Sequence, residues 1–397
     1  MFFSSEDLGT LYLNHEETKK YREVLNSIIN DIDSEIISPK AIEKLFQQTI
    51  LKSLNRNKKQ NPIPLENRIN DLLNDLEKSL NEAPRKIILY HPIEGLASEG
   101  LPFKFGKVEF SVFNNEDYSL FENTVKNNWE DGYSKQKLLE TVHGIKSKEI
   151  DLYGKTIAKF EVSTIDYDAA DILLRKALSL SMDVLNFYSD LIPYHDGFIF
   201  TPGEYQHIYI VIPMISVNKK VGLNFKYHRI GSQTNFSIAK LIEEDKKRNL
   251  GLAKISNLIA KNHNHLEDRI ISAMRWAGSA TAEEDKEKSF LEYIISLETL
   301  ILGEKSRNGI NYRLQTRVAK LFSKNYEEYE KIKNDIKRLY KIRSDIVHDG
   351  KYQVIDSDLA LIRYYAKSSI LRLLTDSDFD SIDNDDLLDW FNKKTFQ

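Results

Sequence analysis

The spacing of apolar residues separates an amino-terminal helical stretch from the rest of the chain. From residue 1 to 85, apolar positions recur at the period of a helix with one buried face. The segments with this pattern are residues 16–37, 39–54 and 64–80. A polar, proline-bearing stretch at 55–64 interrupts them and predicts a loop. We therefore expect an N-terminal helical segment over residues 1–85.

A different pattern follows, in which short apolar or alternating runs rich in Ile, Val, Phe and Tyr are bounded by Gly, Pro or Asn. Such runs predict β-strands. They are residues 86–90, 103–113, 155–162, 207–214 and 223–228. One long helical pattern, residues 169–191, interrupts them. We expect a mixed α/β domain over residues 86–250 with an antiparallel sheet. It contains no phosphate-binding loop, dinucleotide-binding glycine pattern or nucleophile elbow.

From residue 236 to 374 the pattern is helical again. Four segments joined by short connections predict antiparallel helices of a bundle: residues 289–302, 311–322, 325–347 and 356–374. Gly350 is a natural stop for the third of these helices, because glycine enters the left-handed conformation without steric cost. The fold class is therefore α+β. An N-terminal helical segment and a mixed α/β domain precede an all-α domain over residues 251–397.

The composition of the 397 residues is that of a globular protein, with 41% hydrophobic and 29% charged residues. No apolar run approaches the roughly 18 residues that a membrane-spanning helix needs, and no secretory signal pattern opens the sequence. The absence of Cys excludes disulfides and every metal site built on thiolates. We expect a cytoplasmic protein with no membrane contact, no metal site and no cofactor.

The net charge of −4 argues against a protein that coats nucleic acid, but it leaves room for a local basic site. One candidate for binding RNA is a stripe at helical spacing, formed by Arg313, Arg317, Lys320 and Lys324. The stripe is either a track for phosphates or a solvated helix face. Residues 376–389 are rich in Asp and contain no Lys or Arg. They lack the Gly and the terminal Glu of a calcium loop, so we expect a solvated acidic tail.

Residues with catalytic chemistry meet in Arg343-Ser-Asp-Ile-Val-His348, which is followed by Asp349 and Gly350. A guanidinium can hold a phosphate, and an imidazole can transfer protons near neutral pH. His348 falls in the last helical turn, where the helix dipole favours a cation. An Arg followed by a His at this distance also arises by chance. The alternative is a helix-end salt bridge beside a surface histidine.

The segments around this motif resemble the HEPN superfamily of ribonucleases, and most closely its ApeA-like branch. The resemblance covers residues 266–374. It is carried by Arg269-Ile-Ile-Ser-Ala-Met-Arg-Trp276, Phe290-Leu-Glu-Tyr-Ile-Ile-Ser-Leu-Glu-Thr-Leu-Ile-Leu302, Tyr312-Arg-Leu-Gln-Thr-Arg-Val-Ala-Lys-Leu-Phe322 and Leu339-Tyr-Lys-Ile-Arg-Ser-Asp-Ile-Val-His-Asp-Gly350. Many members of the family have Gly directly after the His, where this chain has Asp349.

The resemblance implies a HEPN-like helical domain that cleaves RNA without a metal ion, often as a toxin or in anti-phage defence by abortive infection. Arg343 and His348 would be the catalytic residues of an Arg-x4-His motif, with Ser344 and Asp345 helping to orient them. The RNA 2′-OH would attack the adjacent phosphate. A Glu recurs in the first bundle helix of this family, so Glu298 would support the site by pairing with Arg343 or Arg313. The alternative for Glu298 is that it faces solvent.

Helix geometry, together with the facing motifs of dimers that the resemblance implies, predicts a homodimer. Residues five apart in a helix lie about 140° apart around its axis and about 7.5 Å apart along it, so Arg343 and His348 of one chain do not converge closely. A second copy, bound through the C-terminal helices, would complete the site. The rival function is a non-catalytic RNA- or partner-binding protein whose bundle serves for dimerisation. We further expect a trigger or inhibitor to act on the N-terminal half, so that a 255–397 fragment would be more toxic or less selective than the whole chain.

Overall fold

The computed structural model describes most of the chain. The described residues are 2–5, 9–32, 37–59, 65–80, 85–93, 95–100, 102–128, 132–146, 154–164, 166–192, 208–212, 236–261, 263–303, 309–350, 353–380 and 382–394. The protein is mostly helical, with one five-stranded antiparallel sheet. This confirms the α+β class. No helix in the described ranges is long and apolar enough to cross a membrane.

The N-terminal elements pack around a small core of their own. A hairpin of two strands precedes three helices: β1 (Phe2–Ser5), β2 (Gly9–Tyr12), α1 (His15–Asp31), α2 (Pro39–Lys59) and α3 (Leu65–Leu80). The helices lie close to the predicted ranges, whereas the hairpin was not predicted. Tyr21 stacks on Phe46 at 5.4 Å between ring centroids, at the centre of this core.

One carboxylate ties the N-terminal helices to the next part of the chain. Asp166 caps the amino end of α6 (Tyr167–Ser189) by accepting the backbone N–H of Ala169 at 3.0 Å. The same carboxylate accepts the backbone N–H and the hydroxyl of Ser38 at 2.7 and 2.8 Å. Ser38 precedes α2, so α2 and α6 begin at one shared cap.

The sheet has the strand order β5-β6-β7-β3-β8. Its strands are β3 (Arg85–Pro92), β5 (Phe103–Phe105), β6 (Val108–Val112), β7 (Thr156–Thr164) and β8 (Ile208–Ile212). The predicted single strand 103–113 is a hairpin, because Gly106 turns the chain with a φ of 62°. The predicted strand 223–228 lies outside the described residues. A separate parallel pair joins β4 (Leu96–Ala97) to β9 (Phe236–Ser237).

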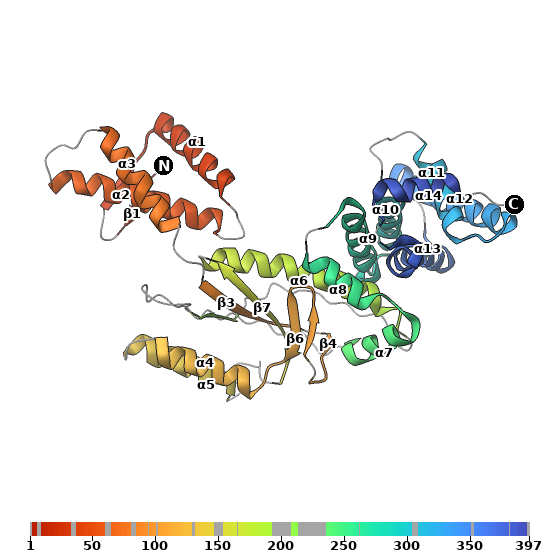
Figure 1. Cartoon of the computed structure of the whole chain (residues 1–397), viewed down its shortest axis with the longest axis horizontal. Coiled ribbons are helices and arrows are strands. Elements are labelled where there is room, and N and C mark those ends of the chain that lie inside the picture. The colour runs from red at the N-terminus through yellow and green to blue at the C-terminus, as the bar shows by residue number, and fades with distance from the viewer. Residues whose placement is uncertain are drawn as a thin grey trace.

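The two faces of the sheet are covered by different helices. On one face, α4 (Asn115–Asn128) and α5 (Tyr133–Lys146) pack over Tyr90 and Ile157, and the ring centre of Phe121 of α4 lies 5.0 Å from that of Tyr90. The sequence reading assigned no helix to these two segments. The other face is covered by α6, as Figure 1 shows.

Helix α6 belongs to the sheet and to the C-terminal helices at once. It packs on β7 and β3 and, more extensively, on α9 (His265–Ala282). At the α6–α9 crossing, a Cβ on Gly278 would run into the backbone carbonyl of Asp183, so only glycine permits this approach. The resulting core is continuous from Ile87 to Phe391. The buried core therefore crosses the expected domain boundary at residue 250, and the domain limits remain predictions.

A buried lysine fixes the carboxyl end of α6. Lys367, on α13 (Asp356–Thr375), is 2% exposed, and its ammonium donates to the backbone carbonyl of Phe187 at 2.6 Å and to the carboxylate of Asp190. Arg363 also approaches Asp190, at 3.6 Å. Burial lowers the pKa of Lys367 to about 8, although Asp190 opposes the shift. A fragment starting at residue 255 would lose α6 and leave this lysine without its partners, so such a fragment tests stability as well as regulation.

The C-terminal region has the predicted helices. They are α7 (Ile238–Arg248), α8 (Leu252–Ala260), α9, α10 (Lys286–Ile301), α11 (Ile310–Phe322), α12 (Tyr326–Asp349) and α13. The four helices predicted over 289–374 are confirmed to within a few residues.

The prediction of a solvated acidic tail is wrong. The aspartates cap two helical elements, the 3-10 turn η1 (Ser377–Phe379) and α14 (Asn384–Lys393). Asp383 accepts the backbone N–H groups of the first turn of α14 at 2.8 and 2.9 Å. Leu387 and Phe391 bury the apolar side of α14 against the bundle. The acids thus mark helix starts, and the apolar residues between them dock the segment.

The contact between Lys367 and Asp190 should be a main connection between α6 and α13. We expect Lys367→Met to lower the free energy of unfolding by about 3 kcal/mol, because it leaves a mostly buried carboxylate with a weaker partner. Adding Asp190→Asn should restore part of the loss. Chemical denaturation of the four proteins of this double-mutant cycle measures the coupling. Strictly additive effects would show that the two groups do not depend on each other.

Candidate functional site

The candidate site lies at the carboxyl end of α12. The helix begins at Asn325, whose side chain accepts the backbone N–H of Glu328 at 2.9 Å. Its buried side carries Ile336 and Leu339, which are 1% and 0% exposed. It ends as predicted at Gly350, which has a φ of 61° and donates its N–H to Ile346 at 3.2 Å. A packed and capped helix therefore fixes the backbone of the motif.

Arg343 is held on one side and open on the other. Its Nε lies 4.0 Å from Oε1 of Glu298, which projects from α10, and its guanidinium lies 5.7 Å from the ring centre of Tyr340. The predicted pairing of Glu298 with Arg343 is thus present. The side chain of Arg343 remains 29% exposed. A guanidinium held in this way can still donate to an anion from the solvent side.

Glu298 is a poorly solvated carboxylate. Burial raises the pKa of Glu298, while the charge of Arg343 and the hydroxyl of Tyr340 partly oppose the rise. Among the described residues, no hydrogen bond reaches its Oε1. The carboxylate therefore gains little from the fold itself. Its evident physical effect is to attract and orient Arg343.

His348 is exposed in the last turn of α12 and makes no hydrogen bond or ion pair with any described residue. Its neighbour Val347 is also exposed, at 50%. Ser344 and Asp345, the predicted helpers, are half-buried between the two motif residues. The imidazole is thus open to solvent, and no contact within the chain joins it to Arg343.

Two arginines hold the end of α10, the helix that carries Glu298. Arg269 from α9 donates to the carbonyls of Thr299, at 3.1 Å, and of Leu300. Arg317 from α11 donates to those of Ile301 and Leu302, at 3.3 and 2.8 Å. These carbonyls have no partner within the helix and carry the negative end of its dipole. Two buried guanidinium groups therefore satisfy the carboxyl end of α10.

This arrangement corrects the predicted RNA-binding stripe. Arg317 is 8% exposed and lies over the ring of Phe391, while the ammonium of Lys320 donates to the backbone carbonyl of Phe391 at 2.7 Å. Arg313 is half-buried, and Lys324 is exposed. The spacing correctly put Arg313, Arg317 and Lys320 on one side of α11, where α14 covers Arg317 and Lys320. Lys324 lies beyond the end of the helix. The four residues do not form a continuous exposed track.

Sequence reasoning missed Arg269 and Tyr340 as parts of this site. Arg269 could have been found, because it interrupts the apolar side of its helix between Leu266 and Ile270. A basic residue in such a position needs a buried partner. Tyr340 gives no such signal, because a tyrosine beside Leu339 fits an ordinary buried helix side. His263 and His265 are close in the sequence, but His263 is bonded to Asp268 and to the backbone carbonyl of Leu258. No group of potential metal ligands occurs among the residues that the structure describes.

Replacing Glu298 by Gln should separate its charge from its shape. A carboxyl group whose pKa is raised on folding contributes stability below its unfolded pKa, and that stability is lost as pH rises through the folded pKa. We therefore expect Glu298→Gln to be at least as stable as the wild type at pH 7. The difference in stability between the variant and the wild type should vanish near pH 4, where both side chains are neutral. Thermal unfolding across pH 4 to 8 measures it, and a variant that is less stable at pH 7 alone would contradict this account.

Comparison of the chain with models of protein families, with curated proteins and with solved structures finds no significant match.

Proposed function

We propose that the protein is a metal-independent endoribonuclease of the HEPN type. The observation that carries the proposal is the end of α12, where Arg343 is oriented by Glu298 yet 29% exposed and His348 is exposed to solvent. A phosphate-holding cation and a proton-transferring group thus stand on one rigid, capped helix end. The bundle helices and the Arg-x4-His motif resemble that superfamily.

The chemistry uses only these side chains and the RNA. The 2′-OH attacks the adjacent phosphorus and loses its proton to a base, so that a 2′-O–P bond forms and the P–O5′ bond breaks. A proton is delivered to the leaving 5′-oxygen, which gives a 2′,3′-cyclic phosphate and a 5′-OH. His348 serves as base or acid. Arg343 stabilises the negative charge that builds up on the phosphate oxygens. DNA lacks the nucleophile and is inert.

A homodimer completes the site. His348 and Arg343 of one chain make no contact, and their angular separation on α12 keeps them apart. The surface beside the motif carries apolar side chains, because Val347 and Ile355 are 50% and 55% exposed. An apolar surface beside charged groups is typical of an interface between copies. With facing copies, the histidine of one chain and that of its partner can divide the roles of acid and base.

A toxin or anti-phage defence effector fits this chemistry, because an unregulated ribonuclease harms its own cell. The N-terminal half then carries the control, through an inhibitor or a trigger. Helix α6 can carry this control from the N-terminal half to the bundle, because α6 packs on the sheet and on α9 and Lys367 fixes its carboxyl end. A rival function, non-catalytic binding of RNA or of a partner protein, predicts binding without cleavage.

We expect the purified protein to cleave single-stranded RNA in the presence of EDTA. Arg343→Ala and His348→Ala should each reduce the rate by about 100-fold or more, because each removes one of two essential roles. Gel analysis of labelled RNA measures the rate, and end analysis should find a cyclic phosphate. Both side chains are partly or fully exposed, so the unfolding temperature should stay close to that of the wild type.

Matched controls exist on α1, where Arg22 and His15 are exposed. Arg22→Ala and His15→Ala remove the same groups from the surface and should leave cleavage unchanged. Retention of cleavage in both motif variants, or its loss in EDTA, would refute the mechanism. Tight RNA binding without cleavage in the wild type would favour the rival function.

The dimer is tested by a charge at the apolar surface beside the motif. Val347→Asp should convert the protein to a monomer and abolish cleavage, whereas Val24→Asp, at an equally exposed valine on α1, should change neither. Light scattering at micromolar concentration reports the mass. Mixing Arg343→Ala with His348→Ala protein distinguishes two kinds of dimer site. If each site takes its Arg and its His from different chains, cleavage should return to about a quarter of the wild-type rate, whereas a site that needs both histidines should stay inactive. A fully active monomer would contradict the dimer.

A further inference from the structure

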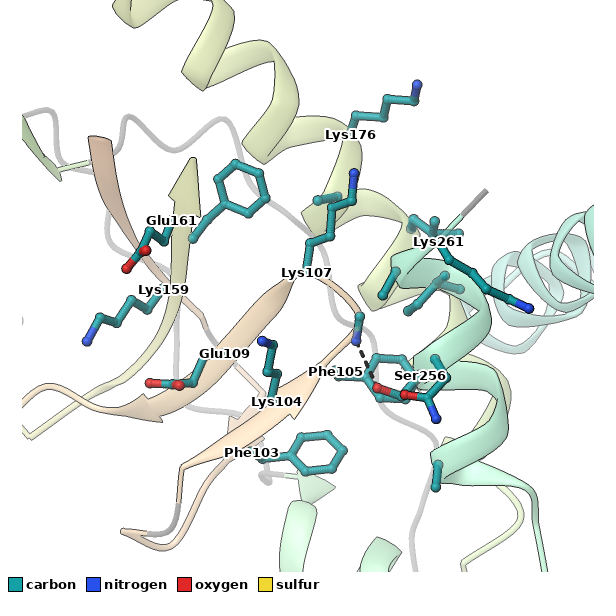
Figure 2. A pocket seen from close by; sticks show the side chains of 18 of the residues that line it. Phe103, Lys104, Phe105, Lys107, Glu109, Lys159, Glu161, Lys176, Ser256 and Lys261 are labelled. Carbon is teal, nitrogen blue, oxygen red and sulfur yellow. Dashed lines mark hydrogen bonds between the residues drawn. The ribbon is translucent and has the colours of Figure 1, made fainter. Parts of the chain in front are cut away.

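A broad groove lies away from the motif, between the β5–β6 hairpin, β7, α6 and α8 (Figure 2). We call it the hairpin groove. Its volume is about 1580 Å³, whereas pockets for small molecules measure about 300 to 1,000 Å³. The groove is therefore larger than a single metabolite requires. Its dimensions suit an extended ligand.

The hairpin groove presents cations that the protein does not neutralise. Lys104 and Lys107 project from the hairpin and Lys176 from α6, and all three are exposed. None of them forms an ion pair with a carboxylate in the described part of the chain. By contrast, Lys261, on the same groove, is paired with Glu267 at 3.0 Å. The three unpaired lysines give the groove a positive potential that an anionic ligand can use.

The acidic residues that line the groove are mostly engaged elsewhere. Glu161 pairs with Lys86 at 2.8 Å, and Asp268 pairs with His263 at 2.9 Å. Asp245 accepts the backbone N–H of Leu252 at 3.2 Å. Glu109 is the exception, because it is the cross-strand neighbour of Lys104 and of Lys159, on the face of the sheet opposite Phe103. The acids therefore leave most of the lysine charge unopposed.

The groove also has an aromatic surface and a fixed wall. Phe103 is half-buried and stacks on Phe105, with 5.7 Å between centroids and 20° between planes. The hairpin is anchored to α8, because Gly106 donates its N–H to the hydroxyl of Ser256 at 2.9 Å. A side chain at Gly106 would meet Ile259 at 2.6 Å. The lysines of the hairpin are thus carried on a rigid element.

We infer that the hairpin groove binds the sugar–phosphate backbone of single-stranded RNA, with Lys104, Lys107 and Lys176 on phosphates and Phe103 against a base. Unpaired lysines together with an aromatic ring are the combination used for single strands, in which a base is free to stack. Lys104 and Phe103 lie on opposite faces of the edge strand β5, so the bound strand passes around that edge. The inference rests on the proposed ribonuclease function and adds to it a substrate-holding site that is distinct from the end of α12. In Figure 1 that helix and the β6 strand lie in separate parts of the molecule.

The test measures binding in protein that carries Arg343→Ala and His348→Ala, so that cleavage cannot interfere. The probe is a fluorescein-labelled 15-mer of uridine, followed by anisotropy from 50 to 200 mM KCl. We expect the triple variant Lys104→Gln, Lys107→Gln, Lys176→Gln to raise the Kd about tenfold or more at 50 mM KCl. Its salt slope should fall by about 2, because each phosphate contact on a single strand contributes about 0.7. Phe103→Leu should raise the Kd several-fold with little change in that slope.

The matched control is Lys19→Gln, Lys44→Gln, Lys78→Gln, which removes the same charge from exposed lysines on α1, α2 and α3. It should bind like the parent protein. Equal Kd values for the two triple variants would overturn the inference. Competition experiments give a second way to overturn the inference. If polyglutamate or uridine monophosphate displaced the probe as effectively, per charge, as unlabelled RNA does, the groove would instead take an acidic polypeptide or a mononucleotide.

The inference and the proposed function fail in different ways. If the wild-type protein does not cleave RNA but the groove variants still weaken RNA binding, the ribonuclease proposal fails and the groove stands. If cleavage depends on Arg343 and His348 but the groove variants bind RNA normally, the groove inference fails and the ribonuclease stands. With both correct, the groove variants should raise KM for long RNA and leave kcat nearly unchanged.

Discussion

The double burial of α6 is the constraint on which most of the fold depends. One side of this helix covers the sheet and the other packs on α9, so the two halves of the chain share a single core. Gly278 allows the close approach, and Lys367 supplies a cation for the carbonyl of Phe187 and for Asp190. Dispersion and apolar burial hold the interface together, whereas the buried charge specifies the position of the helix end. A change in the sheet that moved α6 would therefore also change its packing against α9 and its contact with α13.

The geometry of the candidate site depends on a second, local arrangement of charge. Helix α10 ends against two guanidinium groups, and Gly303, with a φ of 60°, lies against Arg269 with no room for a Cβ. That end is one turn from Glu298, which in turn faces Arg343 across the bundle. Buried arginines thus locate an acid, and the acid locates the exposed arginine. Cations that sequence spacing assigned to RNA instead hold the scaffold.

What the sequence predicts well is local. The span of α12, its stop at Gly350 and the four helices from 286 to 375 follow from periodicity and capping, which depend on neighbours a few residues away. The pairing of Glu298 with Arg343 was suggested by the family resemblance, which left Arg313 as the other partner and a solvent-facing Glu298 as the alternative. The errors are non-local. Residue spacing shows which residues share a side of α11, but it does not show that α14 covers that side. Likewise, the run of aspartates does not indicate that Phe391, in the same segment, is buried against the bundle.

The same distinction explains why the hairpin groove was invisible in the sequence. Lys104 and Lys107 lie on a hairpin and Lys176 on a helix about 70 residues away, and each alone is an ordinary surface lysine. Lys107 and Lys176 line one groove because α6 covers one face of the sheet, and Lys104 reaches it from the other face of the edge strand β5. A protein with a net charge of −4 can still hold RNA if its few unpaired cations gather in one groove. Phosphate contacts position a strand without reading its sequence, so a groove of this kind would fix where RNA lies on the protein. Selection among RNAs would then fall to the base that meets Phe103 and to the geometry of the two copies of α12.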